Sequence, residues 1–353
     1  MSSNLKNVQF NGVVQKNINK NAQYNDEEVP MDEEKPLKSS INPNTSYEHS
    51  VLTTMSSEED INMKGLLDIS NTSKNENMTS SDDFAVSKSK ENNAQPTFSQ
   101  EYFDEIYENL LLDEARFNQK VNSNYMSFQK SINYKMRAIL VDWIIDIHNQ
   151  CNMKKKTLFQ TIFIIDAFLS KNNIDKKDFQ LLGMASLLIA SKETEVIFPS
   201  LNTFLALSNF AYTKEELVEM EREVIKKLKF DILAPTAEEF YEINAEYFEF
   251  TQEQKYFGEY FLDSSLIDYN LLKYKQSTIA VACGYIVMKF YKLNGVHLIL
   301  DNSSFDVNQK EVKNCARKLC FLIKNLSNSS LGAAKNKYMS KKYMNIAKLC
   351  EGK

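Results

Sequence analysis

The chain has 353 residues, a mass of 40.8 kDa and a formal net charge of −5, with 43% hydrophobic and 25% charged residues. This composition excludes a collagen-like or fully disordered chain, and the length favours two domains with additional segments. No apolar run reaches the roughly 18 residues that a membrane helix needs, and the N-terminus lacks the apolar stretch of a signal peptide. We therefore expect a protein without a membrane partner that stays inside the cell.

Residues 1–97 differ in composition from the rest of the chain. They contain four of the 40 aromatic residues, four of the six prolines, no arginine, and nine lysines against fifteen acidic residues. Such a segment buries too little apolar surface to offset the entropy of ordering it, so we predict a disordered tail. The remaining residues carry a net charge of +1 and 36 aromatic residues, as expected for a globular region.

Residues 98–353 show helical periodicity, because apolar residues recur every three or four positions. The first stripe predicts an N-terminal helix and consists of Tyr102, Ile106, Leu110 and Phe117. About five helices follow, with apolar stripes that begin at Met136, Leu158 and Leu181. Ser200 and Thr213 are expected to cap helices, and Thr213 begins a capping box with Glu216.

Pro235 cannot continue a helix, so it marks a break between two halves. In the second half, apolar stripes predict helices at about 236–248, 252–269, 275–292, 308–326 and 333–349. Each half has the size of a small all-helical domain. We predict an all-α fold with three parts: a tail (1–97), an N-terminal helix with a first domain (98–235), and a second domain (236–353).

The sequence lacks the motifs of common enzyme chemistry. It has no GxxxxGK[ST] or GxGxxG loop, no GxSxG nucleophile and no HExxH zinc motif. The five cysteines are scattered and the three histidines form no cluster, which favours reduced thiols and argues against zinc. His148 and His297 are isolated and are expected to be packing or surface residues. We expect no catalytic residue, no metal and no cofactor.

The stripe that starts at Met136 has two interpretations. It contains Trp143, the only tryptophan of the chain, and Asp146 follows one turn later. Packing in the core explains such a stripe. An apolar floor beside an acid also fits a groove for a peptide that carries apolar residues and an arginine.

Lys192 and Glu221 also have two interpretations. Both border apolar stripes, where a charge is costly unless it is paired. They form either a structural ion pair or two groups that project toward the backbone of a partner.

The segment MRAILVDW at 136–143 resembles the start of the cyclin box of A- and B-type cyclins. Matching segments follow in the family's order, namely IDAFLS at 165–170, SLLIASK at 186–192, LKFDILAPT at 228–236, and residues 277–282 and 337–340. The resemblance covers about residues 100–350 and is nearest to the mitotic B type. It implies tandem five-helix cyclin boxes behind an N-terminal helix. It also implies a regulatory subunit, not an enzyme, that binds and activates a cyclin-dependent kinase in G2/M or mitosis.

The resemblance also implies roles for individual residues. Arg137 and Asp166 would pair internally and hold helices together. The kinase-binding residues would be Lys192, Glu221, Ile189, Glu195, Ile225, Phe230 and Ile232. A groove for Arg-x-Leu-type substrates or inhibitors would consist of Met136, Ile139, Leu140, Trp143, Asp146 and Gln180. In that groove Asp146 would meet the arginine of the peptide.

The chain departs from the family pattern at a few positions. Ala167 replaces an arginine, and Glu193, Thr194 and Glu195 replace the usual aromatic residue and two acids after Lys192. Asp146 is a shorter acid than the usual glutamate. These departures bear on the choice and affinity of a kinase and on the reach of the groove, and they leave the fold prediction unchanged.

Two segments of the tail resemble degradation signals. Lys90, Glu91 and Asn92 form a KEN box, which the anaphase-promoting ubiquitin ligase recognises in this family. Residues 63–71 resemble a destruction box at four positions, although Met63 stands where the box has arginine. Those four positions are Leu66, Asp68, Ile69 and Asn71. The alternative is a short amphipathic segment without a role. Localisation to nucleus and cytoplasm is expected.

Tandem cyclin boxes have a second known use, a scaffold of transcription-factor-IIB type that binds DNA and polymerase. That use predicts a basic face and usually an N-terminal zinc ribbon. The tail has no cysteine and the globular region is nearly neutral, so we expect no nucleic-acid partner.

Overall fold

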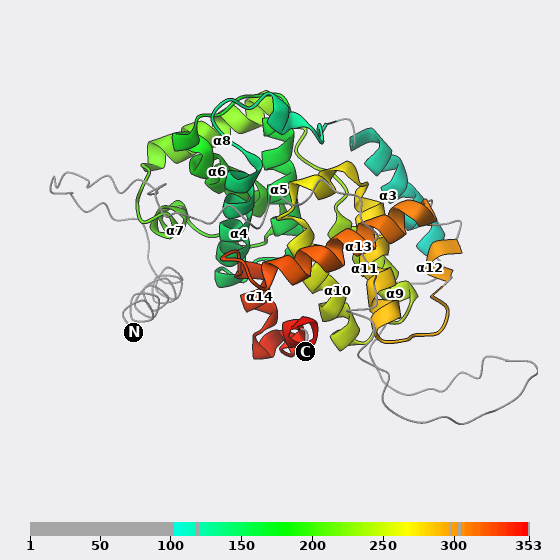
Figure 1. Cartoon of the computed structure of the whole chain (residues 1–353). Helices are drawn as coiled ribbons and strands as arrows, with labels where there is room; N and C mark the ends of the chain where they lie inside the picture. Colours follow the sequence, from blue (N-terminus) through cyan, green and yellow to red (C-terminus); the bar gives the residue numbers. More distant parts are fainter. Residues whose placement is uncertain (1–101, 118–119, 297, 302–304, 306, 352–353) are drawn as a thin grey trace, which may run out of the picture.

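The computed structural model describes residues 102–117, 120–296, 298–301, 305 and 307–351. The tail predicted for residues 1–97, with its candidate degradation signals, lies outside the described residues. All regular elements in the described part are α-helices or 3-10 helices, which confirms the predicted all-α class (Figure 1). No helix in this part combines the length and apolar character needed to cross a bilayer.

The helices form two groups behind an N-terminal helix, α3 (Phe103–Phe117). The first bundle contains α4 (Tyr134–Gln150), α5 (Lys155–Leu169), α6 (Phe179–Thr194), α7 (Leu201–Leu207) and α8 (Lys214–Leu228). The second bundle contains α9 (Ala237–Tyr247), α10 (Gln252–Ser265), α11 (Gln276–Phe290), α12 (Leu298–Asp301), α13 (Gln309–Leu326) and α14 (Ala333–Tyr338). Short 3-10 turns are η3 (Tyr125–Ser127), η4 (Lys176–Asp178), η5 (Tyr269–Lys273), η7 (Lys341–Tyr343) and η8 (Ile346–Cys350).

Local hydrogen bonds explain where several helices begin. The Ser200 side chain accepts from Thr203 N, and Thr213 and Glu216 form the predicted capping box at the start of α8. Helix α8 ends where Lys229 adopts a left-handed conformation with φ 55°. The capping predictions for Ser200 and Thr213 are therefore confirmed.

Each bundle is built around one helix that is buried on nearly all sides. In the first bundle this helix is α6, which packs against α4, α5 and α8. In the second bundle it is α11, which packs against α9, α10 and α13. Gly183 lets α4 approach α6 closely, since a Cβ at this position would lie 2.8 Å from Leu140 Cδ1. The two central helices thus hold the surrounding helices of each bundle in place.

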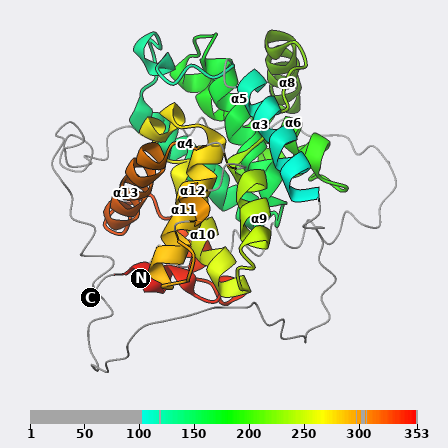
Figure 2. The ribbon, with the colours of Figure 1, turned by 90° about the vertical axis from the view of Figure 1, so that its right-hand side faces the viewer.

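Helix α3 buries a different face from the predicted one. Tyr102 and Ile106 are exposed, whereas Phe103 and Tyr107 are fully buried against aromatic rings of the second bundle. Their partners are Tyr247, Phe240 and Phe305. Apolar residues occupy both faces of this helix, so periodicity alone did not identify the buried one. Figure 2 shows α3 next to α9 at the junction of the bundles.

The last predicted helix, 333–349, is too long. Helix α14 ends at Tyr338, and the chain continues in the 3-10 turns η7 and η8, which are separated by Met344 and Asn345 with left-handed backbones of φ 53° and 54°. Likewise, the helix predicted for 252–269 ends at Ser265, where the chain turns into η5.

Polar contacts join the two bundles. Ala333 N donates to Asp142 Oδ1 at 2.9 Å, and Lys155 pairs with Glu259. Within the second bundle, Lys337 Nζ donates to Asp263 Oδ2 at 2.6 Å with both side chains buried, which fixes α14, the helix that carries Ala333, to α10. These contacts hold the bundles in one arrangement and so place the surface of the first bundle relative to the second.

Candidate functional site: a partner-binding surface on the first bundle

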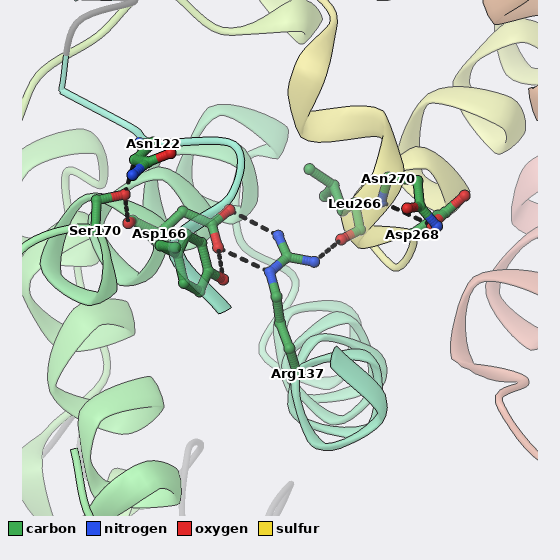
Figure 3. Close-up of polar contacts among 8 residues, drawn as sticks. Asn122, Arg137, Asp166, Ser170, Leu266, Asp268 and Asn270 are labelled. Carbon is green, nitrogen blue, oxygen red and sulfur yellow. Dashed lines mark hydrogen bonds and ion pairs between the residues drawn. The ribbon is translucent and has the colours of Figure 1, made fainter. Parts of the chain in front are cut away.

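Arg137 and Asp166 form a buried, bidentate ion pair (Figure 3). Arg137 Nε donates to Asp166 Oδ1 at 2.7 Å, and Nη2 donates to Oδ2 at 2.6 Å. The Tyr125 hydroxyl also donates to Oδ1, at 2.7 Å. Burial opposes the charge of Arg137, yet the Asp166 carboxylate raises the arginine's pKa above its ordinary value. The structure thus places this pair inside the molecule.

The third arm of Arg137 reaches the second bundle. Its Nη1 donates to the backbone oxygen of Leu266 at 2.9 Å. Arg137 comes from the first turn of α4 and Asp166 from α5, so one guanidinium joins two helices of the first bundle to the end of α10. The pair therefore fixes α4 and α5, two helices that pack against α6, relative to the second bundle.

Lys192 and Glu221 meet at the surface. Lys192 Nζ donates to Glu221 Oε1 at 2.6 Å, and the two side chains are 41% and 13% exposed. Lys192 lies in the last turn of α6 and Glu221 in the middle of α8. Both interpretations of the sequence therefore stay compatible with the geometry: the residues form an ion pair, and solvent still reaches it.

Large apolar side chains are exposed just beyond this pair. Phe230, after the end of α8, is 78% exposed, and Val196 and Ile197, after the end of α6, are each 89% exposed. We call these three residues with Lys192 and Glu221 the α6–α8 surface. Highly exposed apolar side chains after the ends of α6 and α8 make these positions candidates for contact with a partner.

Of the other predicted kinase contacts, some lie at the surface and two do not. Ile225 and Ile232 are partly buried, and Ile225 and Phe230 line a shallow hollow of about 300 Å³ with Arg222, Lys226 and Lys229. Ile189 is only 3% exposed, because it faces the interior from the all-round buried part of α6. In the free chain Ile189 is therefore covered, and its contact with a kinase stays a prediction.

Glu195 is occupied within the chain. Its Oε1 accepts from Lys154 N at 2.7 Å and from the Thr157 hydroxyl. Helix N-termini expose amide groups without an intrahelical partner, and the Lys154 side chain supplies no cap at the start of α5. Glu195 satisfies this helix end, so in the free chain it positions α5 and does not project to solvent as an open contact.

Sequence reasoning missed Val196, Ile197 and the neighbouring Phe198, which is 45% exposed. A signal was present. The three residues are consecutive, apolar, outside every helical stripe and directly followed by Pro199. An apolar run outside the helical stripes indicates side chains that stay exposed and can contact a partner.

The predicted groove is only partly open. Ile139 is 56% exposed, Met136, Trp143 and Gln180 are partly buried, and Asp146 is exposed and accepts from Gln150 Nε2 at 2.8 Å. Partial desolvation by the surrounding side chains raises the pKa of the Asp146 carboxyl above its ordinary value, and the bond from Gln150 opposes this. Leu140 is buried, since it packs against Gly183 of α6. Leu140 therefore lies beneath the surface that Ile139 and Asp146 share.

The described residues hold no cluster of His, Cys, Asp or Glu arranged for a metal ion. His148 is buried, its Nε2 lies 2.7 Å from the Lys154 backbone oxygen, and burial with the Lys337 charge lowers its pKa to about 4. Burial raises the pKa values of Cys315 and Cys320 to about 12, which makes poor nucleophiles of them. His297 lies outside the described residues.

Comparison with known proteins shows the family of the chain. Residues 105–233 match the family model "Cyclin, N-terminal domain", and residues 235–352 match "Cyclin, C-terminal domain". The chain belongs to the cyclin family. Members of this family are regulatory subunits and not enzymes, so the role of this cyclin rests on what its surfaces bind.

Curated relatives are B-type cyclins, which confirms the resemblance to the mitotic type. The chain is 32% identical over 253 residues to a G2/mitotic-specific cyclin-B of Hydra vulgaris, covering 71% of this chain and 69% of that protein. It is 32% identical over 257 residues to a G2/mitotic-specific cyclin-B of Spisula solidissima, covering 72% and 58%. The latter match thus spans less than two thirds of the relative's length.

A solved structure shares the fold of this cyclin. It is a viral cyclin from herpesvirus saimiri, with a TM-score of 0.56 and 19% identity over 63% of this chain and 99% of that chain. At this identity the likeness shows the tandem-bundle fold alone.

Proposed function

We propose that this cyclin binds and activates a cyclin-dependent protein kinase through the α6–α8 surface, and that it acts in G2/M or mitosis. One observation carries the proposal: Lys192 and Glu221 form a partly exposed ion pair, and the most exposed apolar side chains of the described residues follow the ends of the same two helices, α6 and α8. Burying Val196, Ile197 and Phe230 against a partner would supply the driving force, at about 25 cal/mol per Å² of apolar area. The charged pair would supply orientation.

The mechanism is a shift between two states of the kinase. The α6–α8 surface would bind the kinase's αC helix in its inward position and thereby stabilise that position. An inward αC completes the Lys–Glu pair that aligns ATP and releases the activation segment for phosphorylation. The cyclin contributes no reacting group in this mechanism.

Reconstitution tests the proposal. Purified cell-cycle kinases from the chain's own source would be assayed for phosphorylation of a histone-type substrate, with and without the full chain. Strong stimulation of the kinase is the expected result. A folded, helical chain that binds none of these kinases would overturn the proposal and leave the scaffold interpretation.

The groove on α4 is proposed as the docking site for Arg-x-Leu-type substrates or inhibitors. Trp143→Ala is expected to weaken binding of such a peptide about tenfold or more and to spare kinase binding, since it removes the largest apolar wall. Fluorescence titration with a labelled peptide measures the change.

Phe210→Ala provides the control for this prediction. Phe210 is an aromatic residue of the first bundle that is 67% exposed and lies outside the groove. This variant should bind the peptide normally. Should Trp143→Ala instead unfold the chain, as judged by circular dichroism, Trp143 is a core residue and the groove assignment fails.

We propose, finally, that the tail makes the cyclin a substrate of the anaphase-promoting ubiquitin ligase, on the strength of the KEN box at residues 90–92. Replacing all three residues by alanine is expected to lengthen the half-life several-fold in an extract that exits mitosis. The control replaces Lys74, Asn75 and Glu76, which have the same composition in another order. Equal half-lives of the KEN-box variant and the control variant would show that residues 90–92 are not a degradation signal. Localisation to nucleus and cytoplasm is a parallel proposal, which imaging of a tagged chain checks.

A further inference from the structure

Helix α13 carries a line of positive charge along its outer side. At 100° per residue, four basic side chains lie within about 60° of one another. They are Lys310, Lys313, Arg317 and Lys324. The opposite side of the helix holds its buried residues, including Cys315, Leu319 and Ile323. Figure 1 shows α13 lying across the second bundle.

Two further lysines extend this charge toward η5. Lys318 Nζ lies 6.0 Å from the centre of the Tyr274 ring, and Lys273 Nζ lies 5.2 Å from the same centre. Burial and the neighbouring Lys273 ammonium both lower the pKa of Lys318. The Asp268 carboxylate raises the pKa of Lys318 and so offsets part of this repulsion, but the net effect is still a lowered pKa.

The basic ridge is the set Lys273, Lys310, Lys313, Arg317, Lys318 and Lys324. No ion pair within the described part of the chain neutralises any of them, and Arg317 Nη1 donates only to the neutral Asn314 side chain, at 2.6 Å. The one acid of α13, Glu311, is exposed and lies about 100° around the helix from Lys310, on the same side as Lys318, so the line from Lys310 to Lys324 holds basic residues without an acid. The ridge therefore fits an anionic partner.

The same chain contains a segment of opposite charge. Residues 26–34, DEEVPMDEE, have six acids among nine residues and no base, and they lie outside the described residues. We call them the acidic segment. The whole of residues 1–97 has no arginine and a net charge of −6, whereas the rest of the chain has +1. The acidic segment and the basic ridge thus carry opposite charges, although the globular region as a whole is nearly neutral.

The chain path makes contact between the two possible. The described chain begins beside the start of α13, because the Phe103 ring packs 5.9 Å from the Phe305 ring, four residues before Gln309. Helix α13 is about 27 Å long at 1.5 Å per residue. An unstructured chain between residues 34 and 103 would have an end-to-end distance of roughly 45 Å. The acidic segment can therefore reach every position of the ridge.

We propose that the acidic segment docks in cis on the basic ridge, so that the tail folds back onto the second bundle. A tethered segment faces its site at an effective concentration of about a millimolar, which favours it over free competitors of similar charge. Docking closes the intervening residues, including the proposed KEN box, into a loop. This inference stands independently of kinase binding, since the ridge lies on the other bundle.

Amide NMR intensities of the ¹⁵N-labelled full chain test the proposal. Docking ties the acidic segment to a large body and broadens its signals. At about 0.1 M salt we expect these signals to be several-fold weaker than those of residues 11–22. At about 1 M salt, where the Debye length falls from about 10 Å to about 3 Å, the difference should vanish. Equal intensities at low salt would overturn the proposal.

Matched variants locate the contact. Neutralising the ridge with Lys273→Gln, Arg317→Gln and Lys318→Gln should restore the weakened signals at low salt. Neutralising three exposed lysines of the first bundle, with Lys171→Gln, Lys176→Gln and Lys177→Gln, should leave them weak. Docking on α13 is contradicted if the signals of the acidic segment stay weak in the ridge variant. It is also contradicted if they recover equally in both variants.

Two further outcomes would assign the ridge to another partner. If the signals weaken as the protein concentration rises, the acidic segment binds a second copy, and docking in cis is wrong. If a DNA duplex binds the intact full chain through the ridge while the signals of the acidic segment stay sharp, the ridge serves a nucleic acid and the proposal fails. Intensities independent of concentration and unaffected by DNA support it.

Discussion

Replacing Lys192 and Glu221 together by alanine is expected to abolish kinase activation and to leave the helical content unchanged. The pair is partly exposed, and surface ion pairs contribute only about 0–1 kcal/mol to stability. Truncating a charge that a partner desolvates and hydrogen-bonds costs about 2–5 kcal/mol of binding, or roughly 30-fold and upward in affinity. Histone-type phosphorylation measures the first quantity, and circular dichroism the second.

A charge swap separates the two interpretations of this pair. Lys192→Glu with Glu221→Lys keeps an ion pair between α6 and α8 but reverses its direction. A purely structural pair tolerates the swap, whereas a pair that orients a kinase does not, so we expect the swapped chain to be inactive. The control is Lys335→Ala with Glu351→Ala, another partly exposed pair with a 2.7 Å contact, near the C-terminus. Full activity of the swapped chain would contradict our assignment.

Arg137→Ala is expected to cause the largest loss of stability of any single change considered, about 3–5 kcal/mol. It leaves the Asp166 carboxylate buried with Tyr125 as its remaining hydrogen-bond donor from a side chain, and it removes the donor to Leu266 O. Domains are stable by only about 5–15 kcal/mol, so the variant should unfold at a much lower urea concentration. Urea titration followed by circular dichroism measures the shift.

Two companion variants test the reason for that loss. Arg137→Met with Asp166→Leu removes both charges, so no unpaired charge is left inside, and this variant should be more stable than Arg137→Ala. Arg137→Lys keeps the charge but cannot bond two carboxylate oxygens and Leu266 O with one ammonium group, so it should fall between wild type and Arg137→Ala. A double variant less stable than Arg137→Ala would refute the explanation by unpaired charge.

The sequence named candidate residues for the site, but it predicted poorly which of their side chains are exposed. Arg137 and Asp166 lie 29 residues apart and could be paired in advance only through the resemblance to the family. The resemblance implied partner contacts for Ile189 and Leu140, yet both are buried in the free chain because neighbouring helices cover them. Glu195 was expected to face a partner, but it satisfies the start of α5, 41 residues before it in the chain.

The sequence by itself determined the all-α class, the order of the helices and several of their caps. These depend on contacts within four residues, such as Thr213 with Glu216, which the local sequence encodes completely. Only the tertiary structure decided which face each helix buries and which charges stay unpaired. Phe103 rather than Tyr102 is buried, because α3 meets rings more than 130 residues away. Periodicity records that a face is apolar, but the partner that covers it comes from distant parts of the chain.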